Sequence, residues 1–76
     1  MKSLPIKLDS IDQVKSFVDT ISHYDGSFDL GCDKHTVDAK SIMGVLSLDL
    51  NKQLRLNVHN ESSFENISQE LTEFLV

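Results

Sequence analysis

Two segments of this chain carry apolar residues at helical spacing, and this pair of stripes constrains the fold more than any other feature. The first stripe starts after Ser10, runs to about Tyr24, and consists of Ile11, Val14, Phe17, Val18 and Ile21. The second follows Ser62 and consists of Phe64, Ile67, Leu71, Phe74 and Leu75. Ser10 with Gln13, and Ser62 with Glu65, match the capping box that satisfies free N–H groups at a helix start. We therefore expect two amphipathic helices, each with one face to bury.

Segments with alternating apolar residues predict the surface on which these helices pack. Two of them are clear: Phe28, Leu30 and Cys32, and then Leu54, Leu56 and Val58. Two further strands are expected over Lys2–Leu8 and Thr36–Asp38. Pro5 predicts an edge or irregular position in the first strand, because proline cannot donate a ladder hydrogen bond.

The element order that follows is βαββαβα, with a short helix starting at Ser41. We predict one α+β domain over residues 1–76, in which the helices cover one face of a mainly antiparallel four-stranded sheet. The turn at Asp33-Lys34 is expected to be looser than a tight two-residue turn, because the Cβ atom of Lys34 resists positive φ.

Size and charge narrow the possible functions. A chain of 76 residues has little room for a deep enclosed site, so its function is expected on the surface. The 12 acidic and 7 basic side chains give a net charge of −5, which argues against binding nucleic acid or anionic membranes. The sequence has no apolar run long enough to cross a bilayer, and Cys32 is its only cysteine. We expect a soluble cytoplasmic protein, monomeric or weakly dimeric.

The sequence has no pattern typical of catalysis or metal binding. It lacks a glycine-rich phosphate loop and a nucleophile elbow, and no two of His23, His35 and His59 are three or four residues apart. The histidines are therefore interpreted as surface residues, with His23 favourably placed near the end of the first helix. We expect no enzyme, no metal and no cofactor.

The run from Lys40 to Leu48 predicts an interaction surface. Ser41 is suited to cap the short helix that follows it. Ile42, Met43 and Leu46 cannot all point inward from a helix of one or two turns, and an exposed apolar patch usually marks a partner site.

The segment Val37–Leu48 resembles the regulatory-serine segment of HPr, the histidine phosphocarrier of the bacterial sugar phosphotransferase system. Asp19–Asp25 resembles the end of the first helix of that family. The resemblance implies an open-faced β-sandwich with strand order 1-4-2-3. It also implies that Ser41 is phosphorylated by an ATP-dependent serine kinase and then bound by a transcriptional regulator, with Ile42 and Met43 as partner contacts. Lys40 would then lie beside the phosphate.

The same resemblance places Ser10 where the family has its phosphorylated histidine, and Asp12 where it has an arginine. Ser10 is interpreted as a helix cap only, because a serine phosphate ester is too stable to pass its phosphoryl group onward. In this respect the chain is similar to the catabolite-repression HPr-like proteins, which lack the histidine and keep the run from Ala39 to Gly44. Those proteins retain a basic residue near the lost histidine, where this chain has Asp12.

Three hypotheses for function follow. The leading one is a regulatory binding module that is controlled at Ser41 and binds partners through Lys40, Ile42, Met43 and Leu46. Its partners would be an HPr serine kinase, a transcriptional regulator or phosphotransferase enzymes. The alternatives are a phosphocarrier that uses another histidine, and an interaction domain that kept the fold without any phosphorylation.

Overall fold

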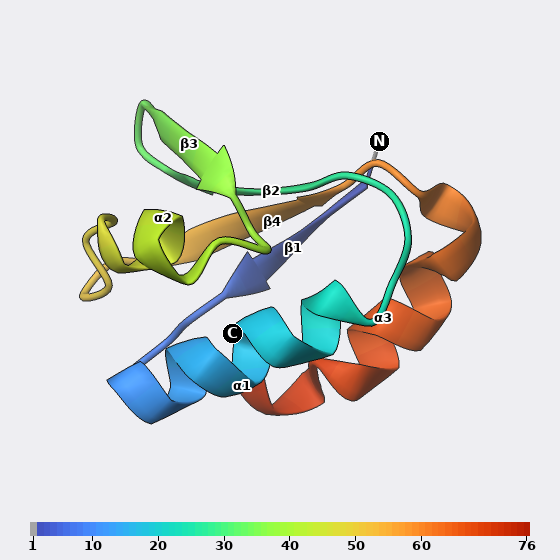
Figure 1. Cartoon of the computed structure of the whole chain (residues 1–76), viewed down its shortest axis with the longest axis horizontal. Helices are drawn as coiled ribbons and strands as arrows, with labels where there is room; N and C mark the ends of the chain where they lie inside the picture. The colour runs from blue at the N-terminus through green and yellow to red at the C-terminus, as the bar shows by residue number, and fades with distance from the viewer. Residues whose placement is uncertain (1) are drawn as a thin grey trace.

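The computed structural model describes residues 2–76, which form a sheet of four strands with helices packed on one face (Figure 1). The strands are β1 (Lys2–Ile6), β2 (Phe28–Cys32), β3 (His35–Asp38) and β4 (Leu54–Val58). The α-helices are α1 (Ile11–Ser22), α2 (Ile42–Leu46) and α3 (Phe64–Glu70), and 3-10 turns occupy Glu61–Ser63 and Thr72–Phe74. The predicted order βαββαβα is confirmed.

Every strand pair in the sheet is antiparallel, and the spatial order is β1-β4-β2-β3. Strand β4 lies between β1 and β2, so that Leu56 faces Leu4 on one side and Leu30 on the other. This arrangement confirms the α+β class and the strand order that the family resemblance implied. Figure 1 shows α1 and α3 side by side beneath the sheet, whereas the short helix α2 lies near the end of β3.

Pro5 lies on an edge strand, as predicted, and costs the sheet no hydrogen bond. Its carbonyl accepts from the N–H of Val76 at 3.2 Å, on the side away from β4. The nitrogen of the same residue points in the same direction, so its missing hydrogen would not have reached β4. Residues after α3 continue this contact, with Leu75 bridging to Ile6 and the N–H of Lys7 donating to the carbonyl of Phe74 at 2.9 Å.

The core lies between the sheet and the two longer helices and contains the predicted stripes. Phe17 of α1 and Phe74 beyond α3 meet edge to face, with ring centroids 5.8 Å apart. The buried apolar side chains are Ile6, Leu8, Val14, Phe17, Val18, Ile21, Phe28, Leu30, Cys32, Ala39, Val45, Leu48, Leu54, Leu56, Val58, Ile67, Leu71 and Phe74. Ile11 is the exception to the first stripe: its side chain is 59% exposed, so its predicted place on the buried face is wrong.

The two predicted capping boxes have different outcomes. Ser10 caps α1, where its Oγ accepts from the N–H of Gln13 at 3.2 Å, although the Gln13 side chain accepts from Asp9 rather than from Ser10. The prediction of a capping box at Ser62 is wrong, because the chain enters α3 through a 3-10 turn. There the Ser62 hydroxyl donates to the side chain of Asn60 at 2.7 Å, and Ser63 takes the cap position without a side-chain bond.

The hairpin between β2 and β3 is tighter than predicted. Cys32 pairs with His35, which leaves only Asp33 and Lys34 in the turn. Of these two residues, Asp33 alone has a positive φ, of 54°, and aspartate tolerates this region better than lysine does. The expectation of a looser turn failed because it assigned the strained position to Lys34.

A hydrogen bond between Tyr24 and Glu70 joins the end of α1 to α3. The Tyr24 hydroxyl donates to the Glu70 carboxylate at 2.6 Å, and this bond, with burial and the nearby negative charge, raises the pKa of Tyr24 to about 12. Because the folded-state pKa exceeds the ordinary value of 10.0, the stabilisation is complete below pH 10 and is lost as the pH rises toward 12.

We therefore expect the phenolate absorbance of the folded protein to titrate with a midpoint near 12. In Glu70→Gln the midpoint should fall toward 10.0, the ordinary value, because the bond to the Glu70 carboxylate, which is the largest cause of the shift, and the charge of that carboxylate are removed. Tyr24→Phe should cost no more than about 1 kcal/mol, since the bond is solvent-exposed. A wild-type midpoint near the ordinary value would contradict this bond.

Candidate functional site

Ser41 sits at the start of α2 and caps it, as predicted. Its backbone is extended, with φ −101° and ψ 112°, and its Oγ accepts from the N–H of Gly44 at 3.1 Å. Its carbonyl accepts from the N–H of Val45 at 2.9 Å, which closes the first turn. The serine is only partly buried.

Gly44 lets the first turn of α2 lie close to both Ser41 and β3. A Cβ atom on Gly44 would lie 3.3 Å from the Ser41 Oγ and 3.3 Å from the Val37 Cβ, tighter than most real contacts. The next residue, Val45, is fully buried and anchors the helix to the core. The position of Ser41 is therefore fixed by packing on both sides of the turn.

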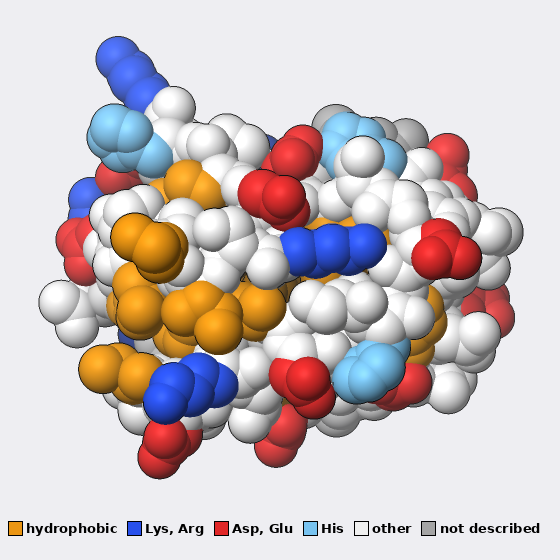
Figure 2. Space-filling model, viewed as in Figure 1, with side chains coloured by type: hydrophobic (Ala, Val, Ile, Leu, Met, Phe, Trp, Pro, Cys, Tyr) orange, Lys and Arg blue, Asp and Glu red, His pale blue; other side chains and the backbone are white. Residues whose placement is uncertain are grey.

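The other three apolar side chains of α2 are exposed, and we call Ile42, Met43 and Leu46 the α2 patch. Their exposed fractions are 40%, 84% and 40%. A helix of five residues anchored through Val45 leaves its remaining side chains outside the core. Figure 2 shows hydrophobic side chains gathered on this end of the molecule, over α2 and toward the start of α1.

Lys40 connects the loop before α2 to the end of α1. Its Nζ donates to the Tyr24 carbonyl at 2.7 Å and lies 5.3 Å from the centre of the Phe28 ring. Its backbone N–H donates to the Asp38 carboxylate at 2.9 Å. Its ammonium thus bonds to the end of α1, and partner contacts through Lys40 stay a prediction.

Ser10 and Asp12 are both exposed at the start of α1. The Ser10 hydroxyl accepts the capping bond from Gln13, and Asp12 adds a negative charge in the first turn. In Figure 1 this end of α1 lies on the same side of the molecule as α2. The start of α1 therefore has a capped N-terminus and an acid, whereas binding of a phosphoryl group there favours positive charge.

The three histidines belong to different parts of the fold: His23 follows α1, His35 begins β3 and His59 follows β4. The Nε2 of His59 lies 2.7 Å from the Asp29 carboxylate across the sheet. Within residues 2–76, no cluster of three or more histidine, cysteine, aspartate or glutamate side chains could hold a metal ion. In the same residues, no helix has the length and apolar character needed to cross a membrane.

The sequence reasoning missed a polar pocket on the face of the sheet away from the helices. It occupies about 340 Å³ beside Arg55, the only arginine of the chain. Two features of the sequence could have pointed to it: Gly31 lies inside a strand, and Arg55 lies between the inward-facing residues of its own strand, so its side chain faces outward. Neither signal predicts a pocket until the strand register places the two residues opposite each other.

Comparisons with known proteins agree on one family. The family model described as "PTS HPr component phosphorylation site" matches residues 13–75, a range that starts after Ser10 and Asp12. Among solved structures, HPr-C-His from Thermoanaerobacter tengcongensis is similar with a TM-score of 0.73 and 23% identity, covering 95% of this chain and 92% of that one. Phosphocarrier protein HPr from Bacillus anthracis str. Ames has a TM-score of 0.65 and 21% identity, covering 92% and 93%. Comparison with curated proteins gives no match.

Proposed function

Since the chain belongs to the HPr family, whose model matches residues 13–75, we propose that it is a regulatory binding module controlled by phosphorylation at Ser41. Proteins of this family are phosphocarriers of the sugar phosphotransferase system and are not enzymes. The observation that carries the proposal is the arrangement at α2. A surface serine caps a short helix that exposes three apolar side chains directly beside it.

Phosphorylation would act on the α2 patch through charge. A phosphate on Ser41 adds about −1.5 to −2 charge at the start of the helix, where the backbone N–H groups favour negative charge. Ile42 and Met43 follow directly in sequence, so any partner that covers these side chains must also accommodate the phosphate. The packing of these two side chains against a partner would then depend on whether Ser41 is phosphorylated, and the domain would not need to refold.

A carrier role is less well supported by the residues present. Ser10 stands at the position that the family resemblance assigns to the phosphorylated histidine, and its hydroxyl is engaged in a cap. Asp12, at the position that the resemblance assigns to an arginine, is an acid in the first turn of α1, and its charge repels a phosphoryl group. We accordingly propose that the protein works in the cytoplasm with the serine kinase, a transcriptional regulator or phosphotransferase enzymes as partners, and that residues 1–76 act as a single domain.

The proposal is tested by intact-mass analysis after two parallel incubations. One contains ATP and an HPr serine kinase, and the other contains phosphoenolpyruvate and the general phosphotransferase enzyme. We expect one phosphate, only in the ATP incubation, mapped to Ser41. It should be absent from Ser41→Ala and retained in Ser10→Ala, which removes the other capping serine.

Two results would contradict the proposal. An acid-labile phosphate in the phosphoenolpyruvate incubation would restore a carrier role and point to one of the three histidines. No phosphate in either incubation would leave an interaction domain in which Ser41 is only a cap.

A further inference from the structure

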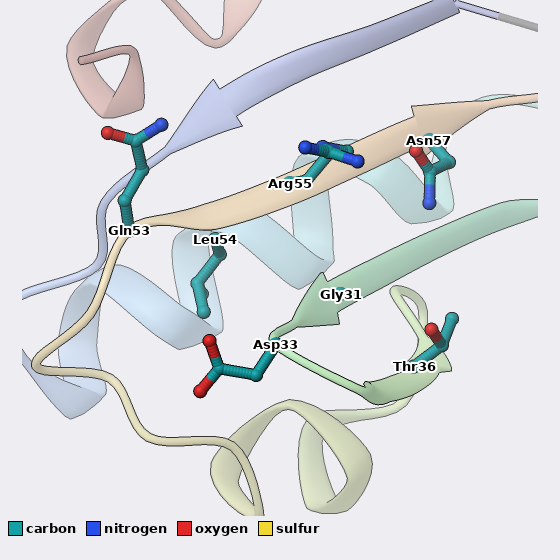
Figure 3. A pocket seen from close by; sticks show the side chains of 7 residues that line it. All are labelled: Gly31, Asp33, Thr36, Gln53, Leu54, Arg55 and Asn57. Atoms are coloured by element: carbon teal, nitrogen blue, oxygen red, sulfur yellow. The ribbon is translucent and has the colours of Figure 1, made fainter.

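The pocket on the open face of the sheet is lined mainly by polar side chains. Figure 3 shows Arg55 and Asn57 on β4 and Thr36 on β3 around the backbone of Gly31, with α1 behind the sheet. Gln53 and Asp33 lie at the other end of the pocket. Its volume of about 340 Å³ is at the lower end of the range for small ligands.

The strand register creates this pocket. Gly31 stands opposite Arg55 on β4 and opposite Thr36 on β3. Because glycine has no side chain, the row of side chains that crosses the sheet here has a gap between Arg55 and Thr36. On the other side of Arg55 stands Pro5, which has no polar group to offer. The hollow is therefore bounded by a cation on one side and a hydroxyl on the other.

Four polar side chains around this hollow, unlike that of Asp33, have no partner among the residues that the structure describes. Across residues 2–76, no hydrogen bond or ion pair engages the side chains of Arg55, Asn57, Thr36 or Gln53. By contrast, the acid at the pocket end is already paired, because Asp33 binds the ammonium of Lys52 at 2.7 Å. Five donors on the Arg55 guanidinium, with one hydroxyl and two amides that both donate and accept, are thus available to a ligand.

We infer that this pocket binds a small hydroxy acid, with its carboxylate on Arg55 and its hydroxyl groups on Thr36 and Asn57. The guanidinium fork matches a planar carboxylate with two parallel hydrogen bonds. The neutral side chains of Thr36 and Asn57 suit hydroxyl groups, for which they can donate or accept. This site lies on the sheet face opposite to the helices and does not depend on phosphorylation at Ser41.

The charges around the pocket favour a single negative charge on the ligand. Arg55 is the only cation among the lining residues, and the Asp33 carboxylate is also present. The ammonium of Lys52 lies 2.7 Å from the Asp33 carboxylate and offsets its charge, so among the lining residues the Arg55 guanidinium supplies the one unpaired charge, which matches a single negative charge on the ligand. The chain carries a net charge of −5, which adds to the cost of a dianion such as a phosphate monoester.

In the experiment, each probe is titrated into the whole chain at constant ionic strength, and binding is monitored by the amide signals in NMR spectra. The probes are gluconate, a hydroxy acid; glucose, which has hydroxyl groups and no charge; and glucose 6-phosphate. We expect gluconate to shift the amide signals of Gly31, Thr36, Arg55 and Asn57 in a saturable way. Glucose and glucose 6-phosphate should bind at least about fivefold more weakly.

Two variants and one control assign the binding to the pocket. Arg55→Gln should weaken gluconate binding at least about tenfold, because it removes the charged fork. Lys15→Gln makes the same change in net charge on the exposed face of α1 and should leave binding unchanged. Gly31→Val should block the hollow and keep the fold, since a Cβ atom there would meet nothing closer than 3.7 Å.

The inference is overturned if gluconate produces no saturable shifts, or if Arg55→Gln and Lys15→Gln bind it equally well. Tighter binding of glucose 6-phosphate than of gluconate would overturn the assignment of a carboxylate. None of these results bears on Ser41, so this inference and the proposed function can fail separately.

Discussion

Replacing Phe17 with alanine is expected to lower the free energy of unfolding by about 3–5 kcal/mol. Phe17 is fully buried and meets Phe74 edge to face, so it joins α1 to the segment after α3. A domain of this size has a free energy of unfolding of about 4–11 kcal/mol, so the variant should lose a large share of its stability. Urea denaturation followed by circular dichroism measures the loss.

Ile11→Ala is the matched control for this prediction. Ile11 lies on the same helix and at the same helical spacing, but its side chain is 59% exposed. We expect a change within about 0.5 kcal/mol, because little apolar surface is removed from water by Ile11 on folding. Equal losses for Phe17→Ala and Ile11→Ala would contradict the arrangement of α1 on the sheet.

The second large effect is expected at the α2 patch. Met43 is 84% exposed and lies two residues after Ser41, so under the proposed function we expect a kinase that acts on Ser41 to contact it. Met43→Asp should lower the kcat/KM of the HPr serine kinase for this protein by at least about tenfold, since loss of a hot-spot side chain at a protein interface costs about 2 kcal/mol or more. The rate of phosphate incorporation from ATP measures this effect.

Val76→Asp is the control for the effect of charge. It makes the same change in net charge at another exposed apolar residue, which is 68% exposed and outside α2. Its kcat/KM should stay within about twofold of wild type, while the folded stability of both variants should change little. A similar loss of kcat/KM in both variants would show that charge, and not the α2 patch, determines recognition.

Much of the fold could be predicted because the alternation typical of strands and the spacing typical of helices occur in separate segments of the sequence. Alternation in Leu54–Val58 and the helical spacing from Val14 to Ile21 each identify a buried face, and both are confirmed. Periodicity shows which residues share one face of a helix or strand. It does not show how far along that face the packed layer on the other side extends. Ile11 satisfies the spacing, and its side chain is still 59% exposed.

The helix start at Ser62 could not be predicted from its motif alone. Serine competes for several local hydrogen bonds, and here Asn60, two residues earlier, offers an acceptor at 2.7 Å. The chain then turns through Glu61–Ser63 before α3 begins. At Ser41 no such competitor intervenes, and the predicted cap forms.

The exposure of the α2 patch followed from the sequence, whereas the pocket beside Arg55 did not. The three side chains of the patch lie within five consecutive residues, and a short helix cannot bury them all. The pocket combines Gly31, Thr36 and Arg55 from three strands, which only the sheet register brings together.

The pairing of the C-terminal residues with β1 also affects how copies of this protein behave at high concentration. An unpaired strand edge is a template on which another chain can add a strand and begin a fibril. Here Val76 and Leu75 cover the outer side of β1 at Pro5 and Ile6. The opposite edge, β3, has only four residues. Intermolecular strand addition is therefore disfavoured at both ends of the sheet, and the folded protein should resist fibril formation even when it is crowded.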